Sequence, residues 1–136
     1  MFELAPEFIR DSVLVTKLKL CQVRLQNDQR FPWLVLIPEV NEVTEVHQLS
    51  QQQQNQLIQE SCLVSSTLKA LTQSTKINVA NLGNVVAQLH WHVVARFEDD
   101  EAWPGPIWGV GSAVPYPDQK RAEFIDSFVK ALNSAQ

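Results

Sequence analysis

The sequence predicts an α+β domain, in which a mainly antiparallel sheet of four or five strands packs against two helices. Short runs rich in β-branched and aromatic residues alternate with turn residues at the spacing of hairpins. Two longer segments instead carry apolar residues at helical spacing. A chain of 136 residues with 45% hydrophobic residues suits one domain with a real core. We therefore expect a single domain over residues 1–136.

The first strands follow from patterns in the N-terminal third of the chain. Residues 12–20 are rich in β-branched residues and leucine, and residues 21–26 alternate apolar and polar side chains, as a half-buried strand does. Asn27 and Asp28 have the side chains of a turn. Residues 33–37 form a short, continuous apolar run closed by Pro38, which favours a central strand.

A long amphipathic helix is predicted from Ser50 to about Gln73. Ser50 and Gln53 have the spacing of a capping box. The apolar stripe continues through the glutamine-rich tract, which favours the solvated face of a helix over disordered polyglutamine. The predicted stripe consists of Leu57, Ile58, Cys62, Ser65, Leu68 and Leu71.

The second half of the chain predicts two more strands and a helix. Residues 76–81 read as a strand, Gly83 and Asn84 as a turn, and residues 86–97 as another strand. A C-terminal helix is expected from about Pro117, with a stripe formed by Ile125, Phe128, Val129 and Leu132.

The segment between the last strand and the C-terminal helix is predicted to be a loop. Residues 98–101 are all acidic, and we expect them simply to solvate this loop. Residues 103–109 carry two prolines, which excludes both a helix and a central strand. Trp103 and Trp108 are expected either to line a pocket or to serve packing or a dimer contact.

Composition excludes several classes of protein. A net charge of −4 argues against a general nucleic-acid-binding surface. The acidic N-terminal residues do not fit a signal peptide, and no segment approaches the length of a membrane span. Cys21 and Cys62 are far apart and are expected to be two buried, reduced thiols. These features predict a soluble, cytoplasmic protein without nucleic-acid or membrane partners.

The run from Gln88 to Val94 carries the main candidate for a functional site. In an extended strand, Gln88, His90 and His92 point to one face, and the apolar residues between them point to the other. The row allows three interpretations: hydrogen-bonded structural histidines, a metal site completed by His47 or Glu98, or a catalytic set. A cupin-type metal site fits poorly, because Glu98 follows His92 too distantly and the chain has only four glycines.

The same run resembles the signature of the histidine-triad (HIT) family, H-φ-H-φ-H-φ-φ, with glutamine at the first position. Other segments agree: residues 24–27 and 33–38 resemble the family's nucleotide-binding hairpin, residues 43–49 its approach to the long helix, and residues 78–86 its strand and turn before the triad. The resemblance covers about residues 12–97. It implies a single HIT-like domain with its core at 12–97 and a C-terminal loop and helix at 98–136. It implies a HIT-like fold with a five-stranded sheet, a long helix and a C-terminal helix.

The resemblance also implies a chemistry, namely hydrolysis or transfer at the α-phosphate of a nucleotide conjugate. His90 matches the nucleophile that forms a covalent nucleotidyl-histidine, and His92 matches its partner beside the phosphate. The backbone carbonyl of Gln88 would hold the nucleophile. Asn27, with Asp28, matches the residues that hold the ribose hydroxyls, and Asn81 and Asn84 match polar residues near the phosphate. The resemblance further implies a homodimer, with no cofactor or metal.

Three departures from the family motif keep a second hypothesis open. Besides Gln88, Val85 stands where the family usually has a serine or threonine near the leaving group, and Trp33 replaces a further family histidine. A non-catalytic nucleotide-binding or regulatory protein is therefore the alternative. An H-x-H metal protein is a remote one.

Overall fold

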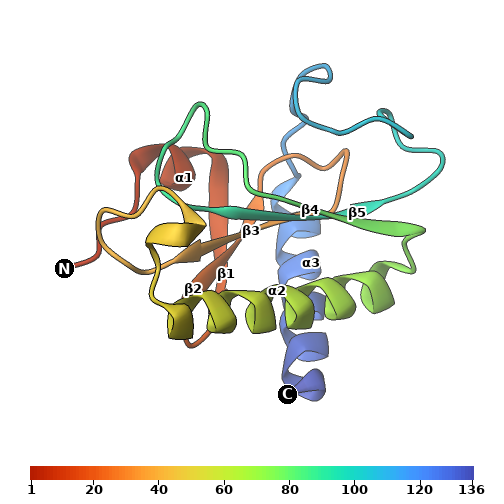
Figure 1. Cartoon of the computed structure of the whole chain (residues 1–136). Helices are drawn as coiled ribbons and strands as arrows, with labels where there is room; N and C mark the ends of the chain where they lie inside the picture. Colours follow the sequence, from red (N-terminus) through yellow and green to blue (C-terminus); the bar gives the residue numbers. More distant parts are fainter.

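A computed structural model describes all residues 1–136 and shows one five-stranded antiparallel sheet in the order β1-β2-β3-β5-β4 (Figure 1). The elements are α1 (Pro6–Asp11), β1 (Ser12–Lys17), β2 (Cys21–Gln26), β3 (Trp33–Pro38), the 3-10 turn η1 (Val46–Gln48), α2 (Gln51–Thr72), β4 (Lys76–Ala80), β5 (Trp91–Arg96) and α3 (Asp118–Ala135). The α+β prediction and the central position of β3 are confirmed. None of the helices is long and apolar enough to span a membrane.

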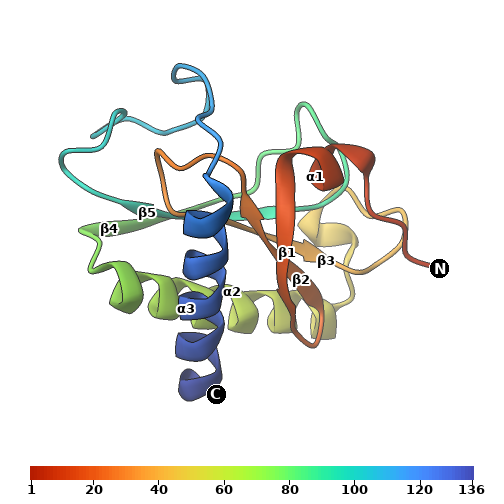
Figure 2. The ribbon, with the colours of Figure 1, turned by 180° about the vertical axis from the view of Figure 1, so that it is seen from behind.

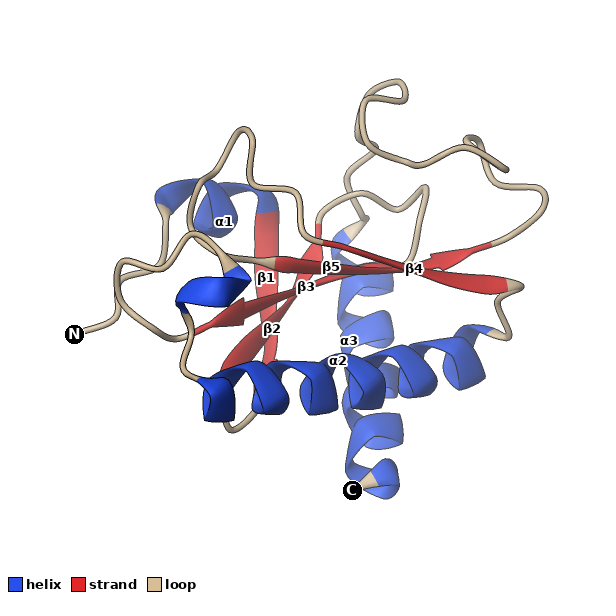
Figure 3. Cartoon of the chain, viewed as in Figure 1, coloured by secondary structure: helices blue, strands red, loops and turns tan.

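The two faces of the sheet have different coverings. The long helices α2 and α3 cover one face, and α1 lies with the long loops on the other side (Figures 2 and 3). Alternation along the strands assigns the side chains: Leu34, Leu36 and Val93 belong to the main core, whereas Val35 and Ile37 pack against Phe8 of α1. The face that α2 and α3 leave uncovered is therefore the one available for a site.

The predicted extent of α2 was correct, but the buried side of the helix is rotated relative to the predicted stripe. The capping box of Ser50 and Gln53 is present. The buried residues of α2 are Leu57, Glu60, Ser61, Val64, Thr67 and Leu68, and half of them are polar. Ile58 is 50% exposed and Cys62 is also exposed, so the expectation of two buried thiols was wrong for Cys62. A stripe that includes glutamate and threonine cannot be located from hydrophobicity alone.

The strand predicted over residues 86–97 is shorter and begins at Trp91. Upstream of it, the N–H of Leu89 donates to the carbonyl of Val43, a loop residue, instead of to a neighbouring strand. The alternation of side chains nevertheless continues, since Leu89 joins the main core while His90 and His92 lie elsewhere. The helix α1 was not predicted, because six residues are too few for a periodic signal.

Candidate functional site

His90 and His92 lie together on the sheet face that the long helices leave free. His92 is on β5, paired with Val35 of β3 and Ala80 of β4, and His90 precedes the strand. The two ring centroids are 4.8 Å apart, with the rings nearly perpendicular. The exposed fractions are only 5% for His90 and 6% for His92, so the pair forms an enclosed site.

The ring of His90 is oriented by the main chain of Gln88. Its Nδ1 lies 2.7 Å from the Gln88 carbonyl oxygen. Because a carbonyl only accepts hydrogen bonds, Nδ1 carries the proton and Nε2 keeps a free lone pair. Burial lowers the pKa of His90, and its backbone contacts only partly oppose this. His90 is thus a neutral imidazole with one unprotonated nitrogen, the form that can act as a nucleophile.

His92 has the opposite arrangement of ring protons. The indole Nε1 of Trp33 donates to its Nδ1 over 2.9 Å. Because the indole N–H can only donate, the neutral His92 ring carries its proton on Nε2. Burial, followed by the neighbouring His90, lowers the pKa of His92 to about 3. The pair therefore combines an Nε2 acceptor on His90 with an Nε2–H donor on His92.

The side chain of Gln88 serves a separate purpose. Its Oε1 accepts from the N–H of Ala5 over 2.8 Å, and its Nε2 donates to the carbonyl of Glu3 over 2.8 Å. These bonds hold the N-terminal segment, whose Phe8 contacts the His90 ring edge-on at 4.8 Å. Sequence reasoning missed this segment as part of the site, and no motif in it would have indicated the contact.

Trp108 closes the other side of the site. Its ring lies 5.3 Å from His92 and 6.4 Å from Trp33, edge-on in both cases. Trp108 therefore packs against His92 of the histidine pair. Trp103 instead lies under the guanidinium of Arg96, 5.7 Å from its ring centroid.

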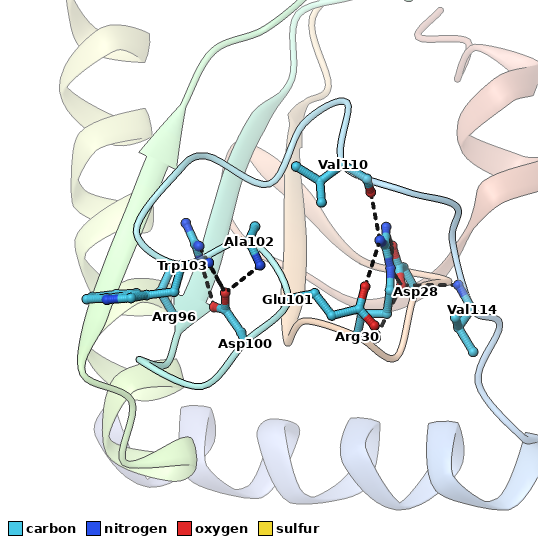
Figure 4. A network of polar contacts seen from close by, with 9 residues as sticks. All are labelled: Asp28, Arg30, Arg96, Asp100, Glu101, Ala102, Trp103, Val110 and Val114. Atoms are coloured by element: carbon cyan, nitrogen blue, oxygen red, sulfur yellow. Dashed lines mark hydrogen bonds and ion pairs between the residues drawn. The ribbon is translucent and has the colours of Figure 1, made fainter.

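An ion pair anchors the start of this loop. Arg96 of β5 binds Asp100 over 2.8 Å, and both side chains are buried, with 1% and 5% exposed. Asp100 also accepts from backbone N–H groups, including those of Ala102 and Trp103 (Figure 4). Burial opposes ionisation, but the bonds from Arg96 and the backbone outweigh it and hold the pKa of Asp100 at about 2. The expectation that residues 98–101 only solvate the loop was wrong for Asp100.

A second ion pair ties the hairpin after β2 to the same loop. The Asp28 carboxylate, 1% exposed, binds Arg30 over 2.8 Å and accepts from the N–H of Val114. Arg30 also donates to the carbonyl of Val110 over 2.7 Å (Figure 4). Burial raises the pKa of Asp28, but Arg30 and the backbone donors lower it further. Both Asp28 oxygens thus have protein partners, so the Asp28 carboxylate, which was predicted to assist Asn27 in holding a ribose, is engaged within the protein.

The predicted asparagines are placed differently from one another. Asn27 accepts from the N–H of Tyr116 over 3.0 Å through its side-chain oxygen, and its amide nitrogen has no protein partner. Asn81 and Asn84 are exposed and line a cavity of about 330 Å³ with Thr44, Glu45, Gly83 and Ala87. The backbone of Leu82, which lies between the two asparagines, raises the pKa of both histidines. This loop therefore contacts the site through its backbone.

The remaining sequence candidates lie outside the histidine pair. Val85 is 95% exposed. His47 lies exposed on η1. The structure contains no group of three or more His, Cys, Asp or Glu side chains arranged to hold a metal ion. The histidines instead have aromatic and backbone neighbours.

Comparisons with known proteins agree on one family. The protein-family model of the HIT domain matches residues 8–99 of the sequence. A histidine triad protein structure from Sinorhizobium meliloti is 43% identical, with 96% of this chain and 97% of that chain covered and a TM-score of 0.95. One from Marinobacter aquaeolei is 37% identical (100% and 99% covered, TM-score 0.96), and one from Bradyrhizobium japonicum is 35% identical (96% and 98% covered, TM-score 0.94). No curated protein matches the chain.

Proposed function

Because the chain belongs to the HIT domain family, we propose that it is a nucleotide-conjugate hydrolase or transferase in which His90 attacks the α-phosphate. The observation that carries this proposal is the bond from His90 Nδ1 to the carbonyl of Gln88. It leaves a lone pair on Nε2 of a neutral ring, which is what attack on phosphorus requires.

The reaction divides into two displacements. In the first, Nε2 of His90 forms a bond to phosphorus while the bond from phosphorus to the leaving group breaks. The ring then carries a positive charge, which the Gln88 carbonyl stabilises by accepting from Nδ1–H. In the second, water attacks phosphorus, the N–P bond breaks, the ring returns to its neutral form, and a proton passes to solvent. In a transferase, another nucleophile replaces the water.

His92 and Asn27 have supporting roles in this proposal. The Nε2–H of His92 is a donor for a non-bridging phosphate oxygen, which gains negative charge as the transition state forms. The free amide nitrogen of Asn27 is a donor for a ribose hydroxyl. Since the His90 ring is only 5% exposed, we expect the N-terminal segment or the Trp108 loop to move when a substrate enters.

Intact-protein mass spectrometry tests the proposal. The protein is mixed briefly with a diadenosine polyphosphate, quenched, and weighed beside the His90→Asn variant. We expect a transient adenylyl adduct on the wild type that is absent in His90→Asn. His47→Asn, which changes an exposed histidine outside the site, is the matched control and should form the adduct normally.

A second candidate function is nucleotide binding without turnover. The exposed Val85, which supplies no hydroxyl near the leaving group, favours it. Saturable binding of AMP with neither adduct nor hydrolysis would establish this alternative and refute the enzyme. The homodimer and the cytoplasmic location remain predictions, the first checked by light scattering on the eluting protein.

A further inference from the structure

The bond between Trp33 and His92 restricts what His92 can do. Trp33 starts β3, and its indole Nε1–H points at Nδ1 of His92 from 2.9 Å. An indole nitrogen neither accepts a hydrogen bond nor loses its proton near neutral pH. A proton added to Nδ1 of His92 would therefore face a second N–H group. The doubly protonated ring and the Nδ1–H tautomer both require this bond to break.

The surroundings of the pair favour the same state. Trp108 packs edge-on against the rings of Trp33 and His92. In the pairing of β3 with β5, Val35 lies opposite His92 and Val94 lies opposite Trp33. The one ionisable side chain that acts on the pKa of His92 is His90, and it disfavours a positive charge on the His92 ring. No carboxylate is placed to stabilise an imidazolium there. His92 thus lacks a counter-ion as well as room for a second proton.

We propose that Trp33 is a positioning residue that fixes His92 as an Nε2–H donor, and that the site consequently takes nucleotides whose leaving group departs as a stable anion. The inference deepens the proposed function and rests on it. A fixed neutral imidazole can hydrogen-bond to a phosphate oxygen, but it cannot give up its only ring proton to a leaving group without becoming an imidazolate.

Proton balance then defines the substrate class. When His90 Nε2 bonds to phosphorus, the leaving atom takes the electron pair of the bond that breaks. A phosphate or polyphosphate group leaves as a stable oxyanion and needs no proton. An alkoxide or the nitrogen of a phosphoramidate must be protonated as it departs. Val85 offers no hydroxyl for this, and His92 offers no second proton. The site therefore favours phosphoanhydride-linked nucleotides over phosphoramidates and alkyl esters.

The first test is spectroscopic and does not need turnover. We compare ¹⁵N shifts of the His92 ring in the wild type, Trp33→Phe and Trp91→Phe. Trp91 is a matched control because its indole also donates a hydrogen bond, to Ser61 over 2.9 Å, on the opposite face of the sheet. We expect Nδ1 of His92 to stay unprotonated in the wild type and in Trp91→Phe even at pH values well below about 6.5. Trp33→Phe should show mixed tautomers or protonation at higher pH.

The second test measures leaving-group dependence of kcat/KM. Adenosine 5′-(4-nitrophenyl phosphate) and adenosine 5′-(phenyl phosphate) share a nucleotide and differ in the acidity of the phenol that leaves. We expect the wild type and Trp91→Phe to prefer the nitrophenyl ester by about tenfold or more, equivalent to about 1.4 kcal/mol of barrier. In Trp33→Phe, where His92 is free to take a second proton, this ratio should shrink.

The outcomes separate the inference from the function beneath it. A proton on Nδ1 of His92, or unchanged His92 shifts in Trp33→Phe, would overturn the role of Trp33. Equal rates for both esters in the wild type would overturn the leaving-group selectivity. If the wild type turns over neither ester while His92 keeps its Nε2–H, the hydrolase function and the selectivity fall together and only the tautomer assignment is supported.

Discussion

The carbonyl oxygen of Gln88 lies 2.7 Å from Nδ1 of His90 and fixes the ring of the proposed nucleophile. The side chain of the same residue instead bonds to the backbone of Glu3 and Ala5. The main chain and the side chain of Gln88 therefore serve different ends. A glutamine two residues before His90 supplies the carbonyl, and its amide attaches the N-terminal segment, whose Phe8 contacts the His90 ring.

Gln88→Ala separates these two roles. Because the substitution keeps the carbonyl, we expect adduct formation at His90 to remain within a few-fold of the wild type. Loss of two hydrogen bonds should cost roughly 1–2 kcal/mol of unfolding free energy and speed amide hydrogen exchange at Ala5. Gln119→Ala, which removes an exposed amide on α3, is the control and should change neither quantity. Loss of the adduct in Gln88→Ala would show that the side chain itself takes part in the chemistry.

The lowered pKa values of the two histidines predict a loss of stability in acid. Burial lowers the pKa of His90 as well as that of His92, which falls to about 3. Below about pH 6.5 the unfolded chain binds protons that the folded site excludes. The free energy of unfolding therefore decreases as the pH is lowered through this window. Each histidine contributes a slope of about 1.4 kcal/mol per pH unit where its folded form stays neutral.

Denaturant unfolding at several pH values below about 6.5 measures the slope of the unfolding free energy against pH. In His92→Asn the slope between about 6.5 and the folded pKa of about 3 should be reduced by the share of one histidine. His47→Asn should leave it unchanged, because His47 is exposed on η1. An identical pH dependence in the wild type and His92→Asn would contradict the neutral, enclosed state assigned to His92.

The loop that carries Trp108 should depend on Asp100 and not on its acidic neighbour. Asp100→Asn leaves Arg96, 1% exposed, without a counter-charge, and a broken buried pair typically costs about 3–5 kcal/mol. Glu101→Gln is the matched control, because the Glu101 carboxylate is 61% exposed and its ion pair with Arg30 should contribute less than about 1 kcal/mol. Thermal unfolding of both variants measures the difference. Similar losses in the two would mean that Asp100 does not anchor the loop.

Local patterns in the sequence were sufficient for the elements that they encode. The capping box at Ser50 predicted the start of α2, and the apolar run before Pro38 predicted the central strand β3. The alternation through His90 and His92 predicted that both rings would share a face. Such signals depend on neighbours within a few residues, and the motif from Gln88 to Val94 is itself only seven residues long.

Contacts between distant residues could not be predicted in this way. Trp33 and His92 are 59 residues apart, and nothing in the run after the hairpin shows that an indole will donate to a histidine on β5. The bond from Ala5 to Gln88 spans 83 residues. The buried side of α2 includes Glu60, whose carboxylate accepts from the N–H groups of Leu20 and Cys21. A buried polar group is placed by its tertiary partners, which hydrophobicity does not report.

The two cysteines differ in environment, and their reactivity should differ accordingly. Cys21 is 1% exposed on β2, and burial, followed by the charge of Glu60, raises the pKa of its thiol. Cys62 is exposed on α2. Because the thiolate is the reactive form and needs access to reagent, we expect a thiol-specific probe to label one site per native chain, Cys62. Cys62→Ser should lose this labelling and Cys21→Ser should keep it. Rapid labelling of Cys21 without denaturant would mean that the contact between β2 and α2 near Glu60 opens far more readily than the burial of Cys21 implies, because a thiol enclosed between these elements reacts only when they separate.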